Sequence, residues 1–394
     1  MWYDRYFEEL IRKSLNNFPV VLITGPRQTG KTSLLKKMFP DYSYISLDEP
    51  VNAEYADTNP KLFLSELNNP LIIDEVQYAP GLFRFIKASV DSSIKKKGQY
   101  ILTGSQDFAL MQNVSESLSG RCAILTMLSL SSTEILNKTN VDEFEIMLKG
   151  GFPELWSNPE NNKEVWFSSY LATYLERDVR NLLNISNLRD FDRFLRTVAA
   201  RTGQILSYSE ISRDIGVSVP TVKSWISVLQ ASKQIFILEP YFKNLGKRIV
   251  KTPKLYFLDI GLALYLNGIK TREQLLTSPY IGNFWETFVI SEICKLYSFK
   301  GIKPEIWFWR DKTGNEVDCV IDRGGNYTIM EIKFSERLGE SDFKGIAAFK
   351  KFYDQNKKNR FNTYILCRAG KTYKKNNEIN IINIPAGLRK FDAI

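Results

Sequence analysis

One short segment of the chain has the residue types and spacing of a loop that binds nucleotide phosphates. Residues 25–32 read GPRQTGKT, which matches the pattern G-x-x-x-x-G-K-[ST]. The two glycines let successive backbone N–H groups point into one concavity, and the N-terminus of a following helix adds its dipole. Lys31 can then reach the β- and γ-phosphates, and the Thr32 hydroxyl can bind Mg²⁺. The segment therefore predicts a nucleotide triphosphate as ligand.

The sequence on either side of this loop agrees with that prediction. Residues 18–24 form a short apolar run rich in β-branched side chains, and residues 33–39 continue as a helix that ends before Pro40. A strand, a loop and a helix in this order are the context that the motif requires. The alternative is a coincidental glycine-rich turn, which this context disfavours.

Two carboxylates stand at the end of a second apolar strand, in residues 70–75, which read PLIIDE. An aspartate in this position, Asp74, can hold Mg²⁺ through water, and Glu75 can act as the general base for an attacking water. A strand that simply ends in solvated acids is the alternative. We expect ATP and Mg²⁺ as cofactors, with Thr32 and Asp74 as the Mg²⁺ ligands. The predicted nucleotide-binding residues are Gly25, Pro26, Arg27, Gln28, Thr29, Gly30, Lys31, Thr32 and Asp74.

Two further polar residues are candidates for the same reaction. The strand expected at 99–103 leads to Ser105, whose hydroxyl can orient the lytic water, although a solvated strand end fits nearly as well. Arg121 precedes an apolar run at 123–128, and a guanidinium there can meet the charge that develops on a γ-phosphate, most plausibly that of a neighbouring subunit. A surface arginine paired with Glu116 is the alternative. The first interpretation predicts a homo-oligomer.

A second group of chemistry-bearing residues lies near the C-terminus. The runs 316–321 and 327–333 flank Gly324-Gly325, which signals a tight hairpin. With these glycines as the loop, Asp318 faces Glu331 and Glu316 faces Lys333, on one side of the hairpin. The opposite side then carries the apolar pairs Val317 with Ile332 and Cys319 with Met330.

This hairpin predicts a metal-dependent hydrolytic site. Asp318 and Glu331 can hold a divalent metal, and Lys333 can steady the attacking water or a scissile phosphate. Glu286 lies on the apolar stripe of a predicted helix, an unfavourable place for an unpaired carboxylate, and is predicted as a further ligand. A hairpin with a charged, salt-bridged outer face is the alternative.

The elements that must position these residues divide the chain into four regions. Residues 1–130 alternate short strands and helices, which predicts a parallel sheet wrapped by helices. Helical spacing at 143–149, 163–183 and 191–200 predicts a helical lid over 131–200.

Residues 201–258 have the pattern of a helix-turn-helix with a following hairpin. Ser207 can cap a helix that stops at Gly216, and a second helix then runs from Ser218 to Gln230. The runs 234–241 and 254–258 predict the hairpin of a winged helix. The basic residues around it are Lys243, Lys247, Arg248, Lys251 and Lys254. Contact with the DNA backbone is one interpretation, and a small packing domain with a solvated basic loop is the other.

Composition excludes several classes of function. The 394 residues are 44% hydrophobic and 25% charged, which predicts a globular protein of two or three domains. The chain has no histidine, which excludes Ser-His-Asp hydrolases, H-E-x-x-H proteases and histidine-based nucleases. The four cysteines have no zinc or disulfide spacing, and no apolar run is long enough for a membrane span, so we expect a cytoplasmic protein. The net charge of +9 is compatible with a nucleic-acid partner.

Taken together, these segments resemble a prokaryotic AAA+ family of ATPases that carry a C-terminal domain of unknown function. The likeness covers nearly the whole chain. Its marks are GPRQTGKT, LIIDEVQ, ILTGSQ and SLSGR in the first half, and GGFPE, YLERDV, GVSVPTVKSWISVL, KTPKLYFLDIGLA, NFWETFVISEI and FWRDKTGNEVDCVI in the second.

The resemblance implies an α/β protein with a P-loop AAA+ parallel sheet (1–130), a helical lid (131–200), a winged helix-turn-helix (201–258) and a C-terminal α/β domain of the restriction-endonuclease type (259–394). The residues that match the PD-(D/E)xK nuclease motif are Asp318, Glu331 and Lys333, with Glu286 on the first helix, and Val317 replaces the usual proline. One functional interpretation is an ATPase whose nucleotide state controls a DNA-cutting domain. The other is a non-cutting ATPase switch that binds DNA or protein.

Overall fold

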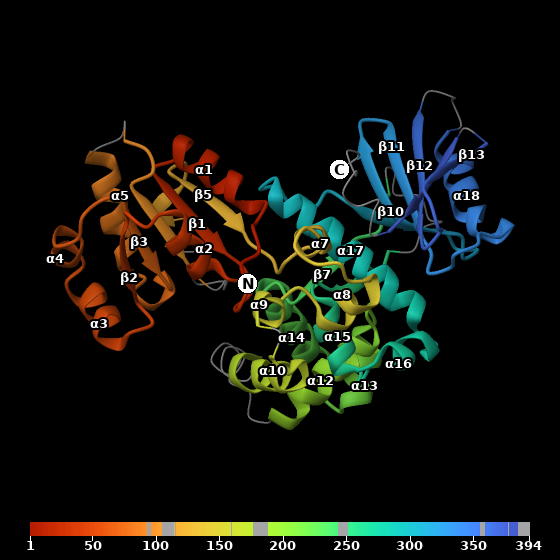
Figure 1. The fold of residues 1–394 in the computed structure, drawn as a ribbon, viewed down its shortest axis with the longest axis horizontal. Helices are drawn as coiled ribbons and strands as arrows, with labels where there is room; N and C mark the ends of the chain where they lie inside the picture. Colours follow the sequence, from red (N-terminus) through yellow and green to blue (C-terminus); the bar gives the residue numbers. More distant parts are fainter. Residues whose placement is uncertain are drawn as a thin grey trace.

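The computed structural model describes residues 1–92, 96–104, 114, 116–158, 160–175, 188–242, 251–354, 359–376 and 378–384. Within these ranges the chain forms a parallel sheet near the N-terminus, a helical middle region and a mixed sheet near the C-terminus (Figure 1). One long helix, α17 (Ile281–Phe299), runs between the first sheet and the last. The predicted α/β class is confirmed.

The N-terminal sheet has the strand order β2-β3-β4-β1-β5, and its neighbouring strands are parallel. The strands are β1 (Val20–Thr24), β2 (Ser43–Ser46), β3 (Leu71–Asp74), β4 (Tyr100–Thr103) and β5 (Cys122–Thr126). Strand β4 therefore lies between β1, which leads into the phosphate loop, and β3, which ends in Asp74. Because the strands are parallel, their carboxyl ends meet at one edge of the sheet.

Helices cover both faces of this sheet, which is why its strands are apolar without alternation. Val21 and Ile23 pack with α1 (Phe7–Asn17) and α2 (Lys31–Met38) on one face. Val20 and Leu22 face the other core, which contains residues of α3 (Pro50–Thr58), α4 (Pro60–Ser65) and α5 (Leu82–Ser92). A short 3₁₀ turn, η1 (Val76–Tyr78), follows β3.

The middle region begins after β5 with a series of short helices. They are α7 (Ser132–Leu136), α8 (Glu143–Lys149), α9 (Pro153–Ser157), α10 (Lys163–Tyr170), the π-helical turn η2 (Leu171–Leu175) and α12 (Leu188–Ala200). The helix predicted at 163–183 is thus followed only to residue 175, and the rest of that segment lies outside the described residues.

A helix pair and a small sheet follow. Helix α13 (Tyr208–Ile215) is capped by the Ser207 hydroxyl and ends at Gly216, whose φ is 84°, and Ser218 caps α14 (Val219–Ala231). The strands β6 (Gln204–Ile205), β8 (Lys254–Phe257) and β7 (Ile235–Leu238) form an antiparallel sheet in this order. Two further helices, α15 (Ile260–Leu266) and α16 (Arg272–Thr277), follow, and α15 packs against α8 and α12. Of the basic residues assigned to the hairpin, Lys243, Lys247 and Arg248 lie outside the described residues.

The C-terminal sheet has the strand order β13-β14-β12-β11-β10-β9. Its strands are β9 (Trp307–Arg310), β10 (Glu316–Arg323), β11 (Asn326–Ile332), β12 (Arg360–Cys367), β13 (Tyr373–Lys375) and β14 (Ile379–Asn383). Between β11 and β12 the chain forms a 3₁₀ turn, η3 (Glu340–Phe343), and α18 (Lys344–Tyr353). Helix α17 packs on one face of the sheet and α18 on the other.

The predicted hairpin register is confirmed in β10 and β11, where Cys319 pairs with Met330 and Arg323 with Asn326 across the Gly324-Gly325 turn. The predicted division into faces is wrong at one point. Val317 lies in the core beneath α18, whereas Cys319 lies in the core beneath α17. The cause is a register shift in the β9–β10 ladder between Val317 and Val320, since an irregularity of this kind reverses the alternation of side chains.

Candidate functional site

The phosphate loop has the backbone conformation that its sequence predicts. Gly25 has a φ of 134°, and a Cβ there would lie 2.1 Å from the carbonyl oxygen of Met127 on the neighbouring segment. Gly30 has a φ of 88° and forms the N-cap of α2. Both positions therefore require glycine. Gly25 needs it for its φ and for the close approach of Met127, and Gly30 needs it for the turn into the helix.

Lys31 lies inside the loop, where its ammonium donates hydrogen bonds to the carbonyl oxygens of Gly25 (3.0 Å) and Pro26 (2.8 Å). Burial lowers the pKa of Lys31 to about 8, and the nearby Glu75 and Asp74 carboxylates act in the opposite direction. An ammonium held by uncharged carbonyls at the N-terminus of a helix is well placed to bind phosphate oxygens. The loop fits a nucleotide.

The Asp74 carboxylate collects hydroxyl donors from three elements. Thr32 Oγ1 lies 3.0 Å from both of its oxygens, Tyr44 donates at 2.9 Å, and Thr103 of β4 also donates to it. Thr32 and Asp74 are therefore in direct contact, as a shared Mg²⁺ site requires. These two residues fit the predicted ion.

Glu75 stands at the tip of β3 in a left-handed conformation, with a φ of 56°. Its backbone N–H donates to Thr103 Oγ1 (3.1 Å), and its carboxylate accepts a hydrogen bond from Gln77. Left-handed backbone is unfavourable for a residue with a Cβ, and such conformations concentrate at functional sites. The second polar candidate of this region, Ser105, lies outside the described residues.

Arg121 lies at the start of β5, at the opposite edge of the sheet from the phosphate loop of the same chain. Its carbonyl accepts a hydrogen bond from Val20 N, at the start of β1. The guanidinium contacts Asp91 of α5 through two hydrogen bonds, of 2.5 and 3.1 Å. The guanidinium thus pairs with Asp91, and Arg121 stands at the end of the strands away from its own phosphate loop.

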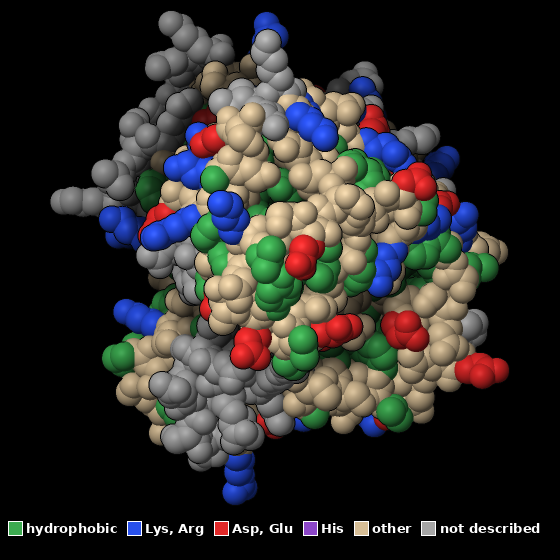
Figure 2. Space-filling view, turned by 90° about the vertical axis from the view of Figure 1, so that its left-hand side faces the viewer, with side chains coloured by type: hydrophobic (Ala, Val, Ile, Leu, Met, Phe, Trp, Pro, Cys, Tyr) green, Lys and Arg blue, Asp and Glu red, His purple; other side chains and the backbone are tan. Residues whose placement is uncertain are grey.

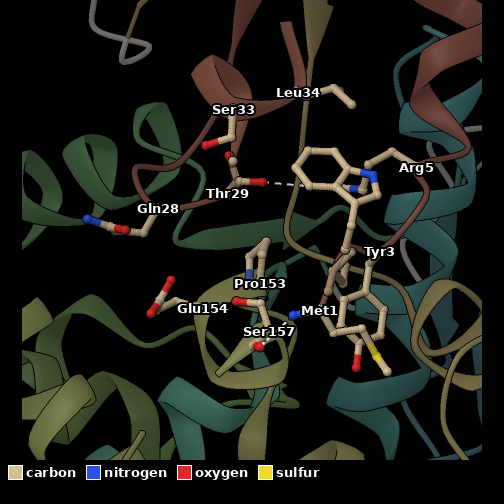
Figure 3. Close-up of a pocket in the computed structure, with 13 residues that line it drawn as sticks. Met1, Tyr3, Arg5, Gln28, Thr29, Ser33, Leu34, Pro153, Glu154 and Ser157 are labelled. Atoms are coloured by element: carbon tan, nitrogen blue, oxygen red, sulfur yellow. Dashed lines mark hydrogen bonds between the residues drawn. The ribbon is translucent and has the colours of Figure 1, made fainter. Parts of the chain in front are cut away.

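A cavity of about 170 Å³ lies beside the phosphate loop. Its walls come from the N-terminal segment, the loop with α2, and α9 of the middle region (Figure 3). Trp2 and Tyr3 supply aromatic surface, and within the described residues Trp2 Nε1 is buried with no hydrogen-bond partner. The lining residues are Met1, Trp2, Tyr3, Arg5, Gln28, Thr29, Gly30, Ser33, Leu34, Leu130, Pro153, Glu154 and Ser157. A cavity that combines aromatic surface with polar side chains suits the base of a nucleotide.

Sequence reasoning missed this cavity and the residue that holds it together. Arg5 is buried, and its guanidinium donates to the carbonyl oxygens of Thr29 (3.0 Å) and Leu128 (2.8 Å) and pairs with Glu134 (3.1 Å). Arg5 thus ties the phosphate loop to the start of the middle region. The available signal was the aromatic pair Trp2-Tyr3 shortly before Arg5, which has no characteristic spacing.

Two of the sequence segments that carry the family resemblance, GGFPE and LDIGLA, contact each other. The carboxylate of Asp259 accepts hydrogen bonds from Gly151 N (2.9 Å) and Ser129 Oγ (3.0 Å). A Cβ on Gly150 would lie 2.1 Å from the same carboxylate. These segments therefore join the helical region to α15, and Pro153 brings α9 against Gly30 of the loop.

The carboxylates predicted near the C-terminus do gather, but the set and its cation differ from the prediction. Oxygens of Glu286, Glu316 and Asp318 all lie within 4.8 Å of one another. The ammonium of Lys254 sits among them, 2.7 Å from Glu286, 2.5 Å from Glu316 and 3.9 Å from Asp318. Lys254 is 3% exposed, so its assignment to an exposed basic cluster around the hairpin is wrong.

Glu331 and Lys333 lie beside this cluster. Lys333 Nζ is 2.6 Å from Glu331 and 4.0 Å from Asp318, and Ile332 N donates to Asp318 at 2.7 Å. Burial, and then the neighbouring acids Glu331 and Glu286, raise the pKa of Asp318 well above its usual value. Burial also raises the pKa of Glu331 to about 7, against the effect of Lys333. The site therefore contains more acidic side chains (four) than lysines (two).

An open polar cavity of about 400 Å³ adjoins the cluster between the small sheet and the C-terminal sheet. Its lining residues are Gly203, Gln204, Ile205, Lys254, Asn283, Glu286, Arg310 and Glu316. Glu286 and Glu316 are therefore accessible to a ligand, and Arg310, 3.4 Å from Glu316, brings a further positive charge to the cavity.

Helix α17 connects the two sites. Near its C-terminal end, Ser298 Oγ donates to the carbonyl of Thr126 in β5 (2.5 Å), and Lys295 donates to the carbonyl of Leu130 (2.9 Å). Glu292 accepts from Ser132 N (2.7 Å) at the start of α7. Glu286 lies on the same helix about 18 Å from Ser298 along the axis, as a rise of 1.5 Å per residue gives. One rigid element thus bears on both sites (Figure 1).

The strand order, the loop and the acidic strand end define the class of protein. Residues 17–136 match the model of a family described as an AAA domain. The chain is therefore a P-loop ATPase of the AAA type. Residues 140–273 and 281–387 match two families described as domains of unknown function, DUF8612 and DUF4143.

Relatives define the family. An uncharacterized protein of Mycobacterium tuberculosis is 31% identical over 327 residues, which cover 82% of this chain and 72% of that protein. An uncharacterized protein of Haemophilus influenzae is 22% identical, covering 89% of this chain and 94% of that protein. The chain belongs to the same family as the mycobacterial protein.

Among solved structures, the chain is similar to a Walker-type ATPase of Pyrococcus abyssi, with 18% identity and a TM-score of 0.45, over 67% of this chain and 96% of that chain. It is also similar to RuvB of Thermotoga maritima, with 16% identity and a TM-score of 0.31, over 58% of this chain and 88% of that chain.

Two observations concern the surface. In the described part of the chain, no helix is both long and apolar enough to cross a membrane. Figure 2 shows the end of the molecule formed by the N-terminal sheet and its helices, where basic and acidic side chains of the described residues are interspersed. The net charge of +9 is therefore not gathered on this face as one continuous basic patch.

Proposed function

We propose that this ATPase couples its nucleotide state to the metal-dependent cleavage of a nucleic-acid phosphodiester by the C-terminal sheet. The observation that carries the proposal is the gathering of Glu286, Glu316, Asp318 and Glu331 with Lys333 beside an open cavity, on a sheet that shares α17 with the ATPase. Carboxylates near a lysine are the groups with which a histidine-free chain can activate water.

In the nucleotide half of the proposal, the loop N–H groups and Lys31 bind the phosphates, while Thr32 and Asp74 hold Mg²⁺, which neutralises phosphate charge. Glu75 accepts a proton from the attacking water, which requires its carboxylate to leave Gln77. Arg121 of an adjacent subunit meets the charge that develops on the γ-phosphate once it separates from Asp91. The aromatic slot of Trp2 and Tyr3 takes the base.

In the second half, Asp318 and its neighbouring acids would supply the oxygen ligands of a divalent metal, whose chemistry when bound is to make water easier to deprotonate. Lys333 bridges Glu331 and Asp318, and from there its ammonium can hold the water or the scissile phosphate. The element order of one helix, three antiparallel strands, a second helix and a parallel strand supports the resemblance to PD-(D/E)xK nucleases.

The nucleic acid is proposed to be DNA, held by the winged helix formed from α13, α14 and the small sheet. Lys223 on α14 and Lys251 before β8 are exposed and available to phosphates. Each such contact contributes a slope of about −0.9 in log K against log salt.

Cleavage of supercoiled plasmid in Mg²⁺ or Mn²⁺, with and without ATP, tests the proposal. We expect nicking by the wild-type chain and a loss of at least about 10²-fold in Asp318→Asn, because a neutral amide is a poorer metal ligand. Glu340→Gln, at an exposed carboxylate of the same domain, serves as the matched control and keeps full activity. If DNA and RNA both stay intact under all these conditions, the nuclease proposal fails.

A second candidate is the non-cutting ATPase switch, in which the C-terminal domain only binds DNA or protein. The position of Lys254 favours it, because an ammonium among the carboxylates already neutralises part of their charge without a metal. This alternative would be selected by a protein that binds DNA in a nucleotide-dependent way and cuts no nucleic acid. Its DNA binding should then be the same in Asp318→Asn.

A further inference from the structure

Lys254 belongs to a different part of the fold from the acids it neutralises. Strand β8, which carries it, is held between β6 and β7 in the small sheet, where Lys254 pairs with Ile205 and Leu238. Its side chain leaves that sheet and enters the acidic cluster of the C-terminal domain. Tyr256, two residues further along β8, also donates a hydrogen bond from its hydroxyl to Glu286. The middle region thus supplies the cation of the C-terminal site.

The geometry around this ammonium is that of a small cation site. Oxygens from Glu286, Glu316 and Asp318 lie within 4.8 Å of one another, a spacing that a single divalent ion can bridge through bonds of about 2.0–2.6 Å. The adjacent Glu331 has a buried oxygen, Oε2, with no hydrogen-bond partner within the described ranges. An unpaired buried carboxylate oxygen is unfavourable, and it adds a further ligand atom next to the cluster.

We propose that the Lys254 ammonium stands in the position of a divalent cation, so that metal binding by Glu286, Glu316 and Asp318 requires this side chain to leave. Lys254 is then a built-in competitor that blocks the metal as long as its ammonium keeps its present contacts with Glu286 and Glu316. The catalytic meaning of that metal rests on the proposed function, whereas the competition itself does not.

The cavity beside the cluster gives the displaced side chain somewhere to go. It measures about 400 Å³, is open to solvent, and includes Lys254, Glu286 and Glu316 in its wall. Because the lysine stem is long and flexible, its ammonium can swing into this space while β8 remains in the ladder.

Titration of the nucleotide-free full-length chain with Mn²⁺, followed by calorimetry and by the electron paramagnetic resonance of the free ion, tests the competition. Lys254→Met removes the charge and keeps an unbranched apolar stem. Removing a unit charge at such short range should tighten Mn²⁺ binding by at least about tenfold. Lys312→Met, at an exposed lysine of the turn between β9 and β10, is the matched control and should bind Mn²⁺ as the wild type does.

Two additions make the result decisive. The Lys254→Met/Asp318→Asn double variant should lose the gained affinity, which assigns it to this cluster rather than to the phosphate loop. Lys254→Gln keeps a hydrogen-bond donor for the acids and serves as a second variant; if either single variant folds only in the presence of Mn²⁺, that dependence also supports the competition.

The proposal is overturned if both single variants bind Mn²⁺ no more tightly than the wild type, or if Asp318→Asn does not remove the gain. Failure of the proposed nuclease is a separate outcome. In that case Lys254→Met binds Mn²⁺ tightly through Asp318 and still leaves plasmid DNA uncut.

Discussion

At the scale of single residues, Thr103 links the two carboxylates at the end of β3. Its hydroxyl donates to Asp74 and accepts from the backbone N–H of Glu75, so the proposed Mg²⁺ ligand and the proposed base are held in one arrangement. The sequence pointed to a polar side chain after this strand, at Ser105. In the structure the contact comes instead from Thr103, the last residue of β4. Its side chain can reach Asp74 because β4 lies directly beside β3.

Glu75→Gln should separate nucleotide binding from hydrolysis. An amide cannot accept the proton of the attacking water, so turnover should fall by about 10²–10⁴-fold while ATP still binds. Steady-state hydrolysis and equilibrium binding of ATP measure the two effects, and Lys31→Ala, which should lose binding, is the reference. Normal hydrolysis by Glu75→Gln would show that another group is the base.

Trp2→Ala should weaken ATP binding without slowing the chemical step. Stacking of a base on an aromatic ring contributes about 1–3 kcal/mol, so KM for ATP should rise by about tenfold or more at an unchanged kcat. Trp2→Phe keeps a ring in the slot lined by Tyr3 and Leu34 and should restore most of the affinity. An unchanged KM in Trp2→Ala would place the base elsewhere.

At the scale of elements, α17 is the physical link between the nucleotide site and the carboxylates. Its C-terminal half bonds to β5 and to the chain that leaves β5, and its N-terminal half carries Glu286. The buried pair Glu292–Lys295, 2.8 Å apart, fixes that attachment. Movement of β5 or of the segment after it must therefore move α17 or break these bonds.

Replacing this pair by the neutral Glu292→Gln/Lys295→Met should uncouple the two sites. The shapes are conserved, so the fold should persist, because a buried ion pair replaced as a whole often leaves stability unchanged. In a Glu75→Gln background, ATP should change hydrogen exchange in residues 316–332 of the otherwise wild-type chain, and this change should be lost in the double variant. Lys312→Met is the control, and persistence of the ATP effect in the double variant would reject α17 as the link.

At the scale of the whole molecule, we expect the position of Arg121 to make activity depend on assembly. It lies across the sheet from its own phosphate loop and is held by Asp91 at a partly exposed surface. If Arg121 acts on a γ-phosphate as proposed, its place in the fold suits the nucleotide of a second copy of the chain rather than its own.

Mixing two inactive variants tests this requirement. Arg121→Ala retains Glu75, and Glu75→Gln retains the guanidinium, so an equal mixture should restore about a quarter of wild-type hydrolysis if subunits combine at random. Sedimentation must show that mixed oligomers form, and Arg84→Ala, at an exposed arginine of α5, should stay fully active alone. No recovery in demonstrated mixed oligomers would exclude action between subunits.

The features that the sequence determined by itself are those set by local spacing. The phosphate loop, the acidic end of β3 and the turn at Gly324-Gly325 each lie within a few residues, and backbone geometry translates such spacing directly into position. The hairpin register followed for the same reason, since the loop residues fix which positions oppose one another.

The tertiary structure alone decided which residues from distant segments meet. Lys254 looked like part of an exposed basic loop, and only the packing of β8 against the C-terminal sheet buries it among Glu286, Glu316 and Asp318. The cavity lined by Trp2 likewise depends on the packing of α9 beside the N-terminal segment. Such contacts arise from the packing of whole elements, and no periodicity along the chain encodes them, because a side chain's partner across an interface has no fixed offset in sequence.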